Sequence, residues 1–164
     1  MVLDVPPGER KSWVIWEEGK GPDVVIELLS EKTAAQDKGR KKQLYQNQLR
    51  VGEYFWFDPF NPQDLAGFGL LGGAYQPIDA GAQGHLPNQV LGLVLRHWQG
   101  AYAGISTVWL RWAFDDGALL PTSEETEALE QQRAEAEKQR ADAAEAELAR
   151  LRALLAARDS PPGG

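Results

Sequence analysis

The chain has 164 residues, of which 43% are hydrophobic, and a formal net charge of −7 at pH 7. This length suits one folded domain with an appendage, and the negative charge argues against a protein that coats nucleic acid through bulk electrostatics. No cysteine occurs, which excludes disulfides, thiolate zinc sites and a cysteine nucleophile. We expect a cytoplasmic protein without membrane insertion, because the sequence shows neither a signal-like N-terminus nor an apolar run of about 18 residues.

The first half of the chain alternates strand-like and helix-like segments. Residues 12–18 (SWVIWEE) and 23–29 (DVVIELL) flank a Gly-Lys-Gly-Pro turn, which predicts a β-hairpin. The straight-chain residues of GRKKQLYQNQLR, at 39–50, predict a helix with Thr33 or Asp37 as its N-cap. A strand over 53–58 (EYFWFD) is then expected to end before Pro59.

Further strands are predicted between residues 67 and 115. GFGLL and AYQPI flank Gly72 and Gly73 as a second hairpin, while residues 90–99 and 107–115 predict further strands. The nearby Gly67 and Gly69 are also interpreted as turn residues. This order of elements predicts an α/β fold with a mixed central sheet and one flanking helix.

From Pro121 the composition changes to Ala, Glu, Gln, Arg and Leu, without Gly or Pro until Pro161. This predicts a second unit, a charged helix over 121–158 capped by Thr122 or Ser123, followed by a disordered tail at 159–164. Alternating spacings of three and four predict a short coiled-coil seam: Ala141, Ala144, Leu148, Leu151 and Leu155. A solvated helix and a helix that binds a second copy or a partner both remain open.

Two acids occur in the aliphatic run of 23–29. Alternate side chains of a strand share a face, so Asp23 and Glu27 lie on the same side. A regular strand separates them by roughly 13 Å, which is too far for both to bind one metal ion. Asp23 follows Pro22 and is expected to be partly solvated. Glu27 lies deep in the run and needs a partner from another element, because an unpaired charge is costly to bury.

The helix predicted after this run offers such a partner. Asp37, Lys41 and Tyr45 recur every four residues and lie along one stripe if the helix begins early enough. A carboxylate held near a lysine, with a metal ion bridging to a phosphate oxygen, is suited to phosphodiester hydrolysis. The same spacing fits a purely structural ion pair between Glu27 and Lys41, so both interpretations remain open.

Three blocks, GPDVVIELLSEKT, DKGRKKQLY and VGEYFWFDP, occur in this order and resemble the Uma-two family of restriction endonucleases over roughly residues 1–120. The resemblance implies the PD-(D/E)XK nuclease fold, DNA as substrate and a divalent ion, Mg²⁺ or Mn²⁺. It implies that Glu27 is the metal-binding acid. Leu29 stands where the usual lysine is expected, and Lys41 takes that role with Tyr45 beside it. Asp23 matches the acid of the family's second Pro-Asp pair and is the other candidate metal ligand.

The resemblance departs at the front of the chain. Family members usually carry a further helix and a strand whose aspartate is the second metal ligand, whereas this chain begins with MVLDVPPGERKSW. Asp4, Glu17 and Glu18 are the acids left as substitutes. We therefore expect an N-terminally truncated nuclease-like domain over 1–120, or a misassigned gene start.

Two functional hypotheses follow. In the first, the chain is a metal-dependent DNA endonuclease that uses Glu27, Lys41, Tyr45 and Asp23. In the second, it is a catalytically impaired nuclease-like remnant that acts as a binding or assembly module through its C-terminal helix, with a homodimer as one arrangement.

Overall fold

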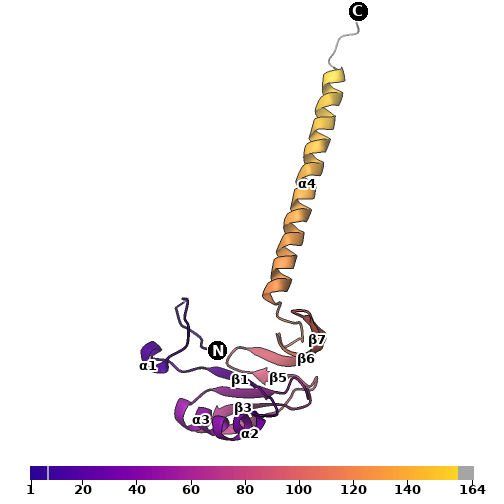
Figure 1. Cartoon of the computed structure of the whole chain (residues 1–164). Helices are drawn as coiled ribbons and strands as arrows, with labels where there is room; N and C mark the ends of the chain where they lie inside the picture. The colour runs from indigo at the N-terminus through magenta and orange to yellow at the C-terminus, as the bar shows by residue number, and fades with distance from the viewer. Residues whose placement is uncertain (7, 159–164) are drawn as a thin grey trace, which may run out of the picture. The chain divides into compact units, whose positions relative to one another are not determined.

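The computed structural model describes residues 1–6 and 8–158. Its internal contacts divide the chain into two compact units, Met1–Leu120 and Pro121–Gly164, which are described separately below (Figure 1). The predicted tail at 159–164 lies outside the described residues.

The first unit contains a four-stranded mixed sheet in which β1 is parallel to β2 and the other neighbours are antiparallel. The strand order is β1-β2-β3-β4. Parallel neighbours require a crossover connection, and the helical segment between β1 and β2 supplies it. The strands are β1 (Val24–Leu28), β2 (Glu53–Phe57), β3 (Leu65–Leu71) and β4 (Ala74–Ile78).

The crossover is a helical segment in four consecutive parts: α2 (Ala34–Gln36), the π-helix η1 (Asp37–Lys41), α3 (Lys42–Leu44) and the π-helix η2 (Tyr45–Leu49). The segment confirms the predicted helix, but it begins at Ala34, before the predicted range of 39–50. Thr33 occupies the N-cap position without a side-chain capping bond, and Asp37 lies inside the helix rather than at its start. The segment ends where Arg50 adopts a φ of 53°.

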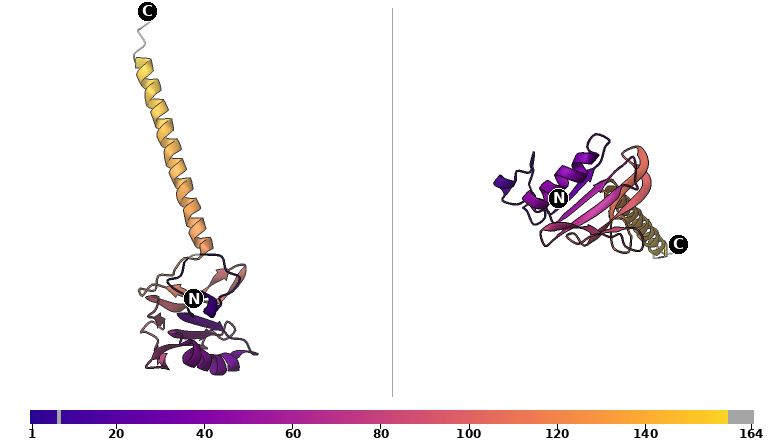
Figure 2. Two further views of the ribbon diagram at one scale, coloured as in Figure 1. Left: turned by 90° about the vertical axis from the view of Figure 1, so that its left-hand side faces the viewer. Right: turned by 90° about the horizontal axis from the view of Figure 1, so that it is seen from below.

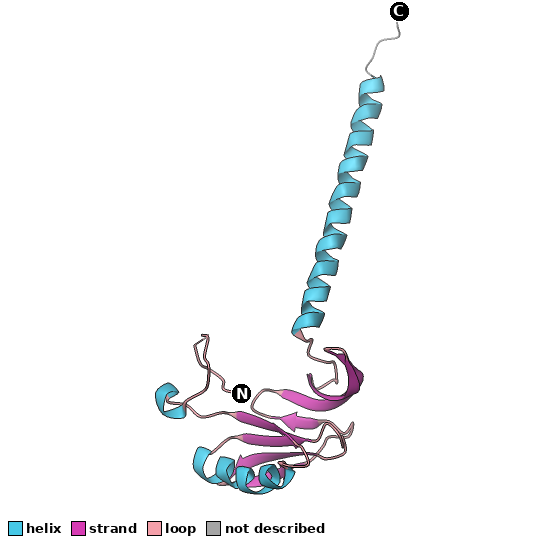
Figure 3. Ribbon diagram, in the orientation of Figure 1, coloured by secondary structure: helices cyan, strands magenta, loops and turns pink. Residues whose placement is uncertain are grey.

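The helical segment covers one face of this sheet, and a second, three-stranded antiparallel sheet lies on the opposite face, as Figures 2 and 3 show. Its strands are β5 (Leu86–Asn88), β6 (Leu93–Tyr102) and β7 (Ile105–Ala113). The core lies between the two sheets and is centred on Val24, Phe55, Leu86 and Leu95. The fold is mixed α/β as predicted, but the single central sheet expected from the sequence is in fact two sheets.

The predicted hairpin of 12–18 with 23–29 is wrong. Residues 12–14 are not a strand, and Ile15–Glu18 form the short helix α1. Gly19 ends this helix at a φ of 71°, and its N–H donates to the carbonyl of Ile15 at 2.8 Å. The start of β1 pairs with Met1 instead, whose carbonyl accepts the N–H of Asp23 at 3.0 Å.

The turn between β3 and β4 confirms the second predicted hairpin. Gly72 and Gly73 have φ angles of 59° and 92°, as a two-residue hairpin turn with two positive φ values requires. Gly67 and Gly69, however, are not turn residues, because both lie within β3. A Cβ atom at Gly67 would lie 2.6 Å from the ring of Phe55, so close packing rather than turn geometry explains this glycine.

The second unit consists of the helix α4 (Ser123–Arg158). Its N-terminus is a capping box: the Thr122 N–H donates to Glu125 Oε2 at 2.8 Å, and the Glu125 N–H donates to Thr122 Oγ1 at 3.2 Å. The predicted long helix is therefore confirmed, with Thr122 as its cap. Among the helices of the described residues, none has both the length and the apolar character needed to span a membrane.

Candidate active site

The two faces of β1 meet different layers, which places Glu27 on the helical side. Val24 is fully buried and belongs to the core between the sheets. Glu27 is three residues further along and therefore points to the opposite face. It pairs in register with Trp56 of β2 beneath the helical segment. Glu27 therefore lies between the sheet and the helical segment, and the helical segment can supply its partners.

Lys41 and Tyr45 are those partners. Lys41 Nζ donates to Glu27 Oε2 at 3.0 Å, and Tyr45 Oη donates to Glu27 Oε1 at 2.8 Å. The Glu27 side chain is only 18% exposed, while that of Lys41 is 32% exposed. The structure therefore brings three of the four predicted site residues into direct contact.

Asp37 completes this cluster from inside the helix. Its side chain is 1% exposed, and Lys41 Nζ lies 2.8 Å from Asp37 Oδ1 as an ion pair. No hydrogen-bond donor of the described residues is aligned with that oxygen. The ammonium of Lys41 is consequently the group that offsets the burial of Asp37. The sequence predicted Asp37 to share a stripe with Lys41 but gave no sign that the carboxylate would be buried.

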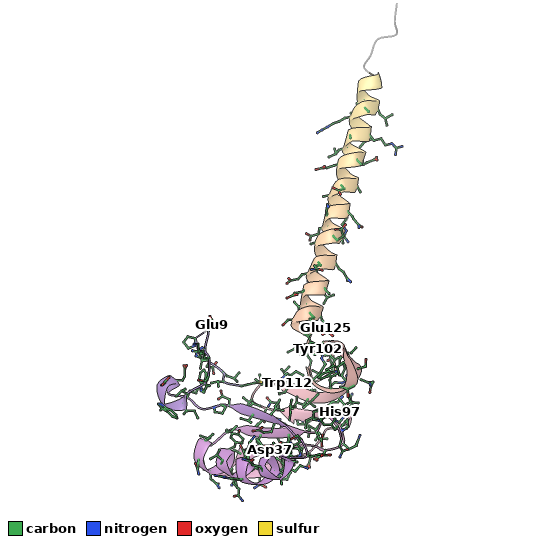
Figure 4. All side chains as sticks on the ribbon, viewed as in Figure 1. Glu9, Asp37, His97, Tyr102, Trp112 and Glu125 are labelled. Carbon is green, nitrogen blue, oxygen red and sulfur yellow. The ribbon has the colours of Figure 1, made fainter. Side chains whose placement is uncertain are left out.

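Residues spaced by four lie along one side of a helix, which is how Asp37, Lys41 and Tyr45 come to share one stripe. Lys41 is the last residue of η1, and Tyr45 is the first residue of η2. π-Helical turns are wider than α-helical turns and often occur at functional sites. The three side chains of the Asp37-Lys41-Tyr45 stripe therefore lie along the sheet-facing side of the segment, where Figure 4 labels Asp37.

The surroundings fix the protonation states of the basic and phenolic groups. Contact with Asp37, followed by contact with Glu27, raises the pKa of Lys41 well above its ordinary value. Burial, followed by the hydrogen bond to Glu27, raises the pKa of Tyr45 to about 12. At neutral pH Lys41 is thus a permanent cation and Tyr45 a permanent hydrogen-bond donor.

A match to a family model identifies the protein family to which this chain belongs. The model of the Uma2 family, described as "Putative restriction endonuclease", matches residues 1–101, a range that contains the whole cluster. The chain belongs to the Uma2 family. No curated protein matches it. Membership of the Uma2 family supports a nuclease at the family level, with DNA as the expected substrate.

The fourth predicted site residue, Asp23, is engaged by residues near the chain start. Its Oδ2 accepts the Leu3 N–H at 2.7 Å and lies 3.1 Å from Lys20 Nζ. Burial alone would raise the pKa of Asp23, but the hydrogen bond from Leu3 and the charge of Lys20 outweigh burial and lower it. The structure gives Asp23 no contact with the cluster of Glu27, and its role as a metal ligand in this Uma2 protein stays a prediction.

Two further lysines of the same helix lie over aromatic rings beside the cluster. Lys42 Nζ is 3.2 Å from the centroid of the Phe68 ring, and burial lowers the pKa of Lys42. Lys38 Nζ lies 5.5 Å from the centroid of the Trp56 ring and also pairs with Asp64. These contacts come from β2, β3 and their connecting loop, so the sequence could identify the basic stretch but not its aromatic partners.

The carboxylates permit a test of whether the cluster suits a divalent ion. Among the described residues, no three His, Cys, Asp or Glu side chains gather to hold a metal ion by themselves. Mg²⁺, however, usually keeps several waters and binds through one or two carboxylates and substrate phosphates. Each oxygen of Glu27 accepts one bond and retains a second lone pair. The donor set therefore fits an ion shared with substrate and water, and does not fit one enclosed by protein ligands.

Proposed function

We propose that this Uma2 protein is a metal-dependent DNA endonuclease of the PD-(D/E)XK type, a hydrolase of phosphodiester bonds. The observation that supports this best is the pair of contacts that Lys41 and Tyr45 make with Glu27. They join a partly buried acid to a permanent cation at a partly exposed position, inside the range matched by a restriction endonuclease family.

Each residue has a separate part in the proposal. Lys41 supplies a fixed positive charge, and its side chain is 32% exposed, so a phosphate oxygen can approach it as negative charge develops there. Tyr45 fixes the orientation of the Glu27 carboxylate by donating to Oε1. Asp37 holds the ammonium of Lys41 from the buried side, so that the cation is already in position before the substrate binds.

Glu27 is the residue proposed to hold Mg²⁺ or Mn²⁺. When bound, such an ion lowers the pKa of a coordinated water and so supplies the attacking nucleophile. Water and a DNA phosphate would supply the other ligands, because the described residues offer no enclosing set of protein ligands. Asp23 stays a candidate metal ligand only on the resemblance of its Pro-Asp pair, and it would bind a different ion from Glu27, because a regular strand separates the two acids by roughly 13 Å.

The proposal is tested by nicking of supercoiled plasmid with Mg²⁺ or Mn²⁺. Glu27→Gln removes the negative charge and Lys41→Ala removes the cation, and each is expected to lower the nicking rate at least about 100-fold. Chelation of the divalent ion is expected to abolish nicking in the unmodified chain. Glu130→Gln and Lys138→Ala, exposed on α4, are the matched controls and should retain the full rate.

The outcomes separate the two functional hypotheses. Nicking that survives both Glu27→Gln and Lys41→Ala would exclude these residues from the mechanism. An unmodified chain that is folded yet shows no nicking with either ion would favour the alternative of a nuclease-like binding module. Thermal unfolding of each variant shows whether a lost rate reflects lost chemistry or a lost fold.

A further inference from the structure

The loop between β2 and β3 presents a phenylalanine to solvent. Phe60 is 90% exposed, although a large aromatic side chain normally gains by being buried. Single exposed hydrophobic residues are common on protein surfaces. Phe60 becomes informative through the way the loop holds it and through the pocket beside it.

The backbone of this loop is closed by several hydrogen bonds. Asp58 Oδ1 accepts the N–H groups of Phe60 at 2.8 Å and Asn61 at 3.2 Å. The Asp58 N–H donates to the Asp64 carbonyl at 3.1 Å, and the Asp64 N–H donates to the Asn61 carbonyl at 2.8 Å. The aromatic ring is therefore carried on a defined turn, which lowers the entropy cost of binding a ligand there.

The same loop is anchored to the candidate active site. The two carboxylate oxygens of Asp64 accept from Lys38 Nζ and, at 3.1 Å, from Trp56 Nε1. Lys38 belongs to η1, the part of the helix that also holds Lys41. The position of Phe60 is thus coupled to the element that positions the cation.

A pocket of about 360 Å³ adjoins the ring and is lined by Ser30, Glu31, Lys32, Asp58 and Phe60. It offers one aromatic wall, carboxylates that can accept from exocyclic amino groups, and an exposed lysine. This combination suits a planar heterocycle joined to a phosphate, since bases stack on aromatic rings and their phosphates attract cations.

The pocket lies at the end of the sheet that carries the candidate site. β1 and β2 are parallel, so their carboxyl ends meet, and the Leu29 N–H donates to the Phe57 carbonyl at 2.8 Å. The pocket begins with Ser30 and Asp58, the residues that directly follow Leu29 and Phe57. Ser30 is three residues beyond Glu27, which corresponds to roughly 10 Å along a strand. A nucleotide close to the bond that is cut is within this range.

We propose that this pocket binds one unpaired nucleobase of the DNA, stacked on Phe60, with Lys32 near the adjoining phosphate. The inference rests on the proposed nuclease function and names its substrate more closely: DNA with a base available outside the double helix. The Glu27-Lys41 cluster contacts the phosphate, whereas the Phe60 pocket favours DNA in which a base is unpaired.

The test measures binding of the full chain to oligonucleotides without divalent ions, so that no cleavage occurs. Three probes carry the fluorescent base 2-aminopurine: a single strand, a duplex with one unpaired 2-aminopurine, and a fully paired duplex. Stacking on Phe60 is expected to change the 2-aminopurine fluorescence and to favour the two probes with an unpaired base.

Phe60→Ala is expected to weaken binding to the unpaired probes by roughly tenfold and to remove the fluorescence change. Phe60→Trp keeps a stacking surface and should retain both. The matched control is Phe114→Ala, which removes another exposed phenylalanine, 48% exposed, from the turn after β7. Equal affinity of the unmodified chain for paired and unpaired probes, or unchanged binding by Phe60→Ala, would overturn the proposal.

The two proposals fail separately. Base binding is measured without divalent ions through the 2-aminopurine fluorescence, whereas the Glu27 cluster is tested by nicking with Mg²⁺ or Mn²⁺. Loss of nicking in Glu27→Gln without any effect of Phe60→Ala on binding would reject only the base pocket. Base binding that depends on Phe60 in a chain that never nicks DNA would reject only the catalytic proposal.

Discussion

Glu27 shows why an acid is tolerated in an aliphatic strand. An unpaired buried carboxylate is costly, but each oxygen of Glu27 accepts a hydrogen bond, one from Tyr45 and one from Lys41. Asp37 is more deeply buried and depends on the same ammonium. Lys41 therefore lies between two carboxylates, and the three groups together carry a formal charge of −1. A structural ion pair and a catalytic site share this geometry, which is why kinetic measurements are needed to distinguish them.

The hydrogen bond of Tyr45 allows a test at the level of one atom. Tyr45→Phe removes the donor to Glu27 Oε1 and is expected to lower the free energy of unfolding by about 1 kcal/mol. Urea unfolding followed by circular dichroism measures this change. Tyr102→Phe, at a position 41% exposed, is the control and should leave stability within about 0.5 kcal/mol. An unchanged stability in Tyr45→Phe would mean that the hydrogen bond contributes nothing.

The same variant predicts an effect of pH. Because the pKa of Tyr45 is raised from 10.0 to about 12 in the folded chain, its contribution to stability is complete below pH 10 and is lost as the pH rises towards 12. Tyr45→Phe should therefore lose less stability than the unmodified chain between these two values. An identical alkaline loss in both chains would contradict this assignment.

Among the elements, the helical crossover has the largest influence on the site. It joins two parallel strands, lies on the face of the sheet opposite the core, and turns the Asp37-Lys41-Tyr45 stripe towards Glu27. Tyr54 strengthens this placement, because its hydroxyl donates to the Asp37 carbonyl at 2.9 Å from β2. The site is thus built from one strand and one helix, with the neighbouring strand holding them together.

Strand β3 provides a stability test that compares two glycines of one element. Gly67→Ala places a methyl group 2.6 Å from the Phe55 ring, whereas the nearest atom to a Cβ at Gly69 is 3.9 Å away. Gly67→Ala is expected to destabilise the fold by about 1–3 kcal/mol through overpacking, and Gly69→Ala by less. Urea unfolding of both variants measures the difference. Equal effects would show that strand propensity, not contact with Phe55, explains the glycine.

At the level of the whole chain, the two units differ in how their apolar residues are used. The first unit buries its apolar residues between two sheets. In α4, Leu148, Leu151 and Leu155 of the predicted seam are 52%, 47% and 54% exposed in the single chain. Association of these leucines with a second copy stays a prediction, as does the alternative of a solvated helix.

Sedimentation velocity over a range of concentrations tests the predicted homodimer. If the seam forms, the unmodified chain should associate more as its concentration rises, because two short heptads give only weak association. The double variant Leu148→Glu, Leu151→Glu places charges in the seam and should weaken association at least about tenfold. Leu129→Glu changes a leucine that is 49% exposed and lies off the seam, and should behave like the unmodified chain. A monomer at every concentration would reject the dimer.

The sequence by itself determined the elements whose patterns are local. The long helix of the second unit follows from its composition and capping residues. The hairpin at Gly72 and Gly73 follows from turn chemistry. The contact of Glu27 with Lys41 and Tyr45 was predictable because it combines the twofold alternation of a strand with the fourfold spacing of a helix.

Only the tertiary structure decided which segments pair and what lies over them. Residues 12–18 have strand-like composition, yet Met1 takes the place beside β1, because strand pairing depends on partners distant in the sequence. The burial of Asp37 and the pocket beside Phe60 depend equally on elements that the chain brings together from separate regions. Local spacing fixes which way a side chain points along its own element, whereas the packing of distant elements fixes what that side chain meets.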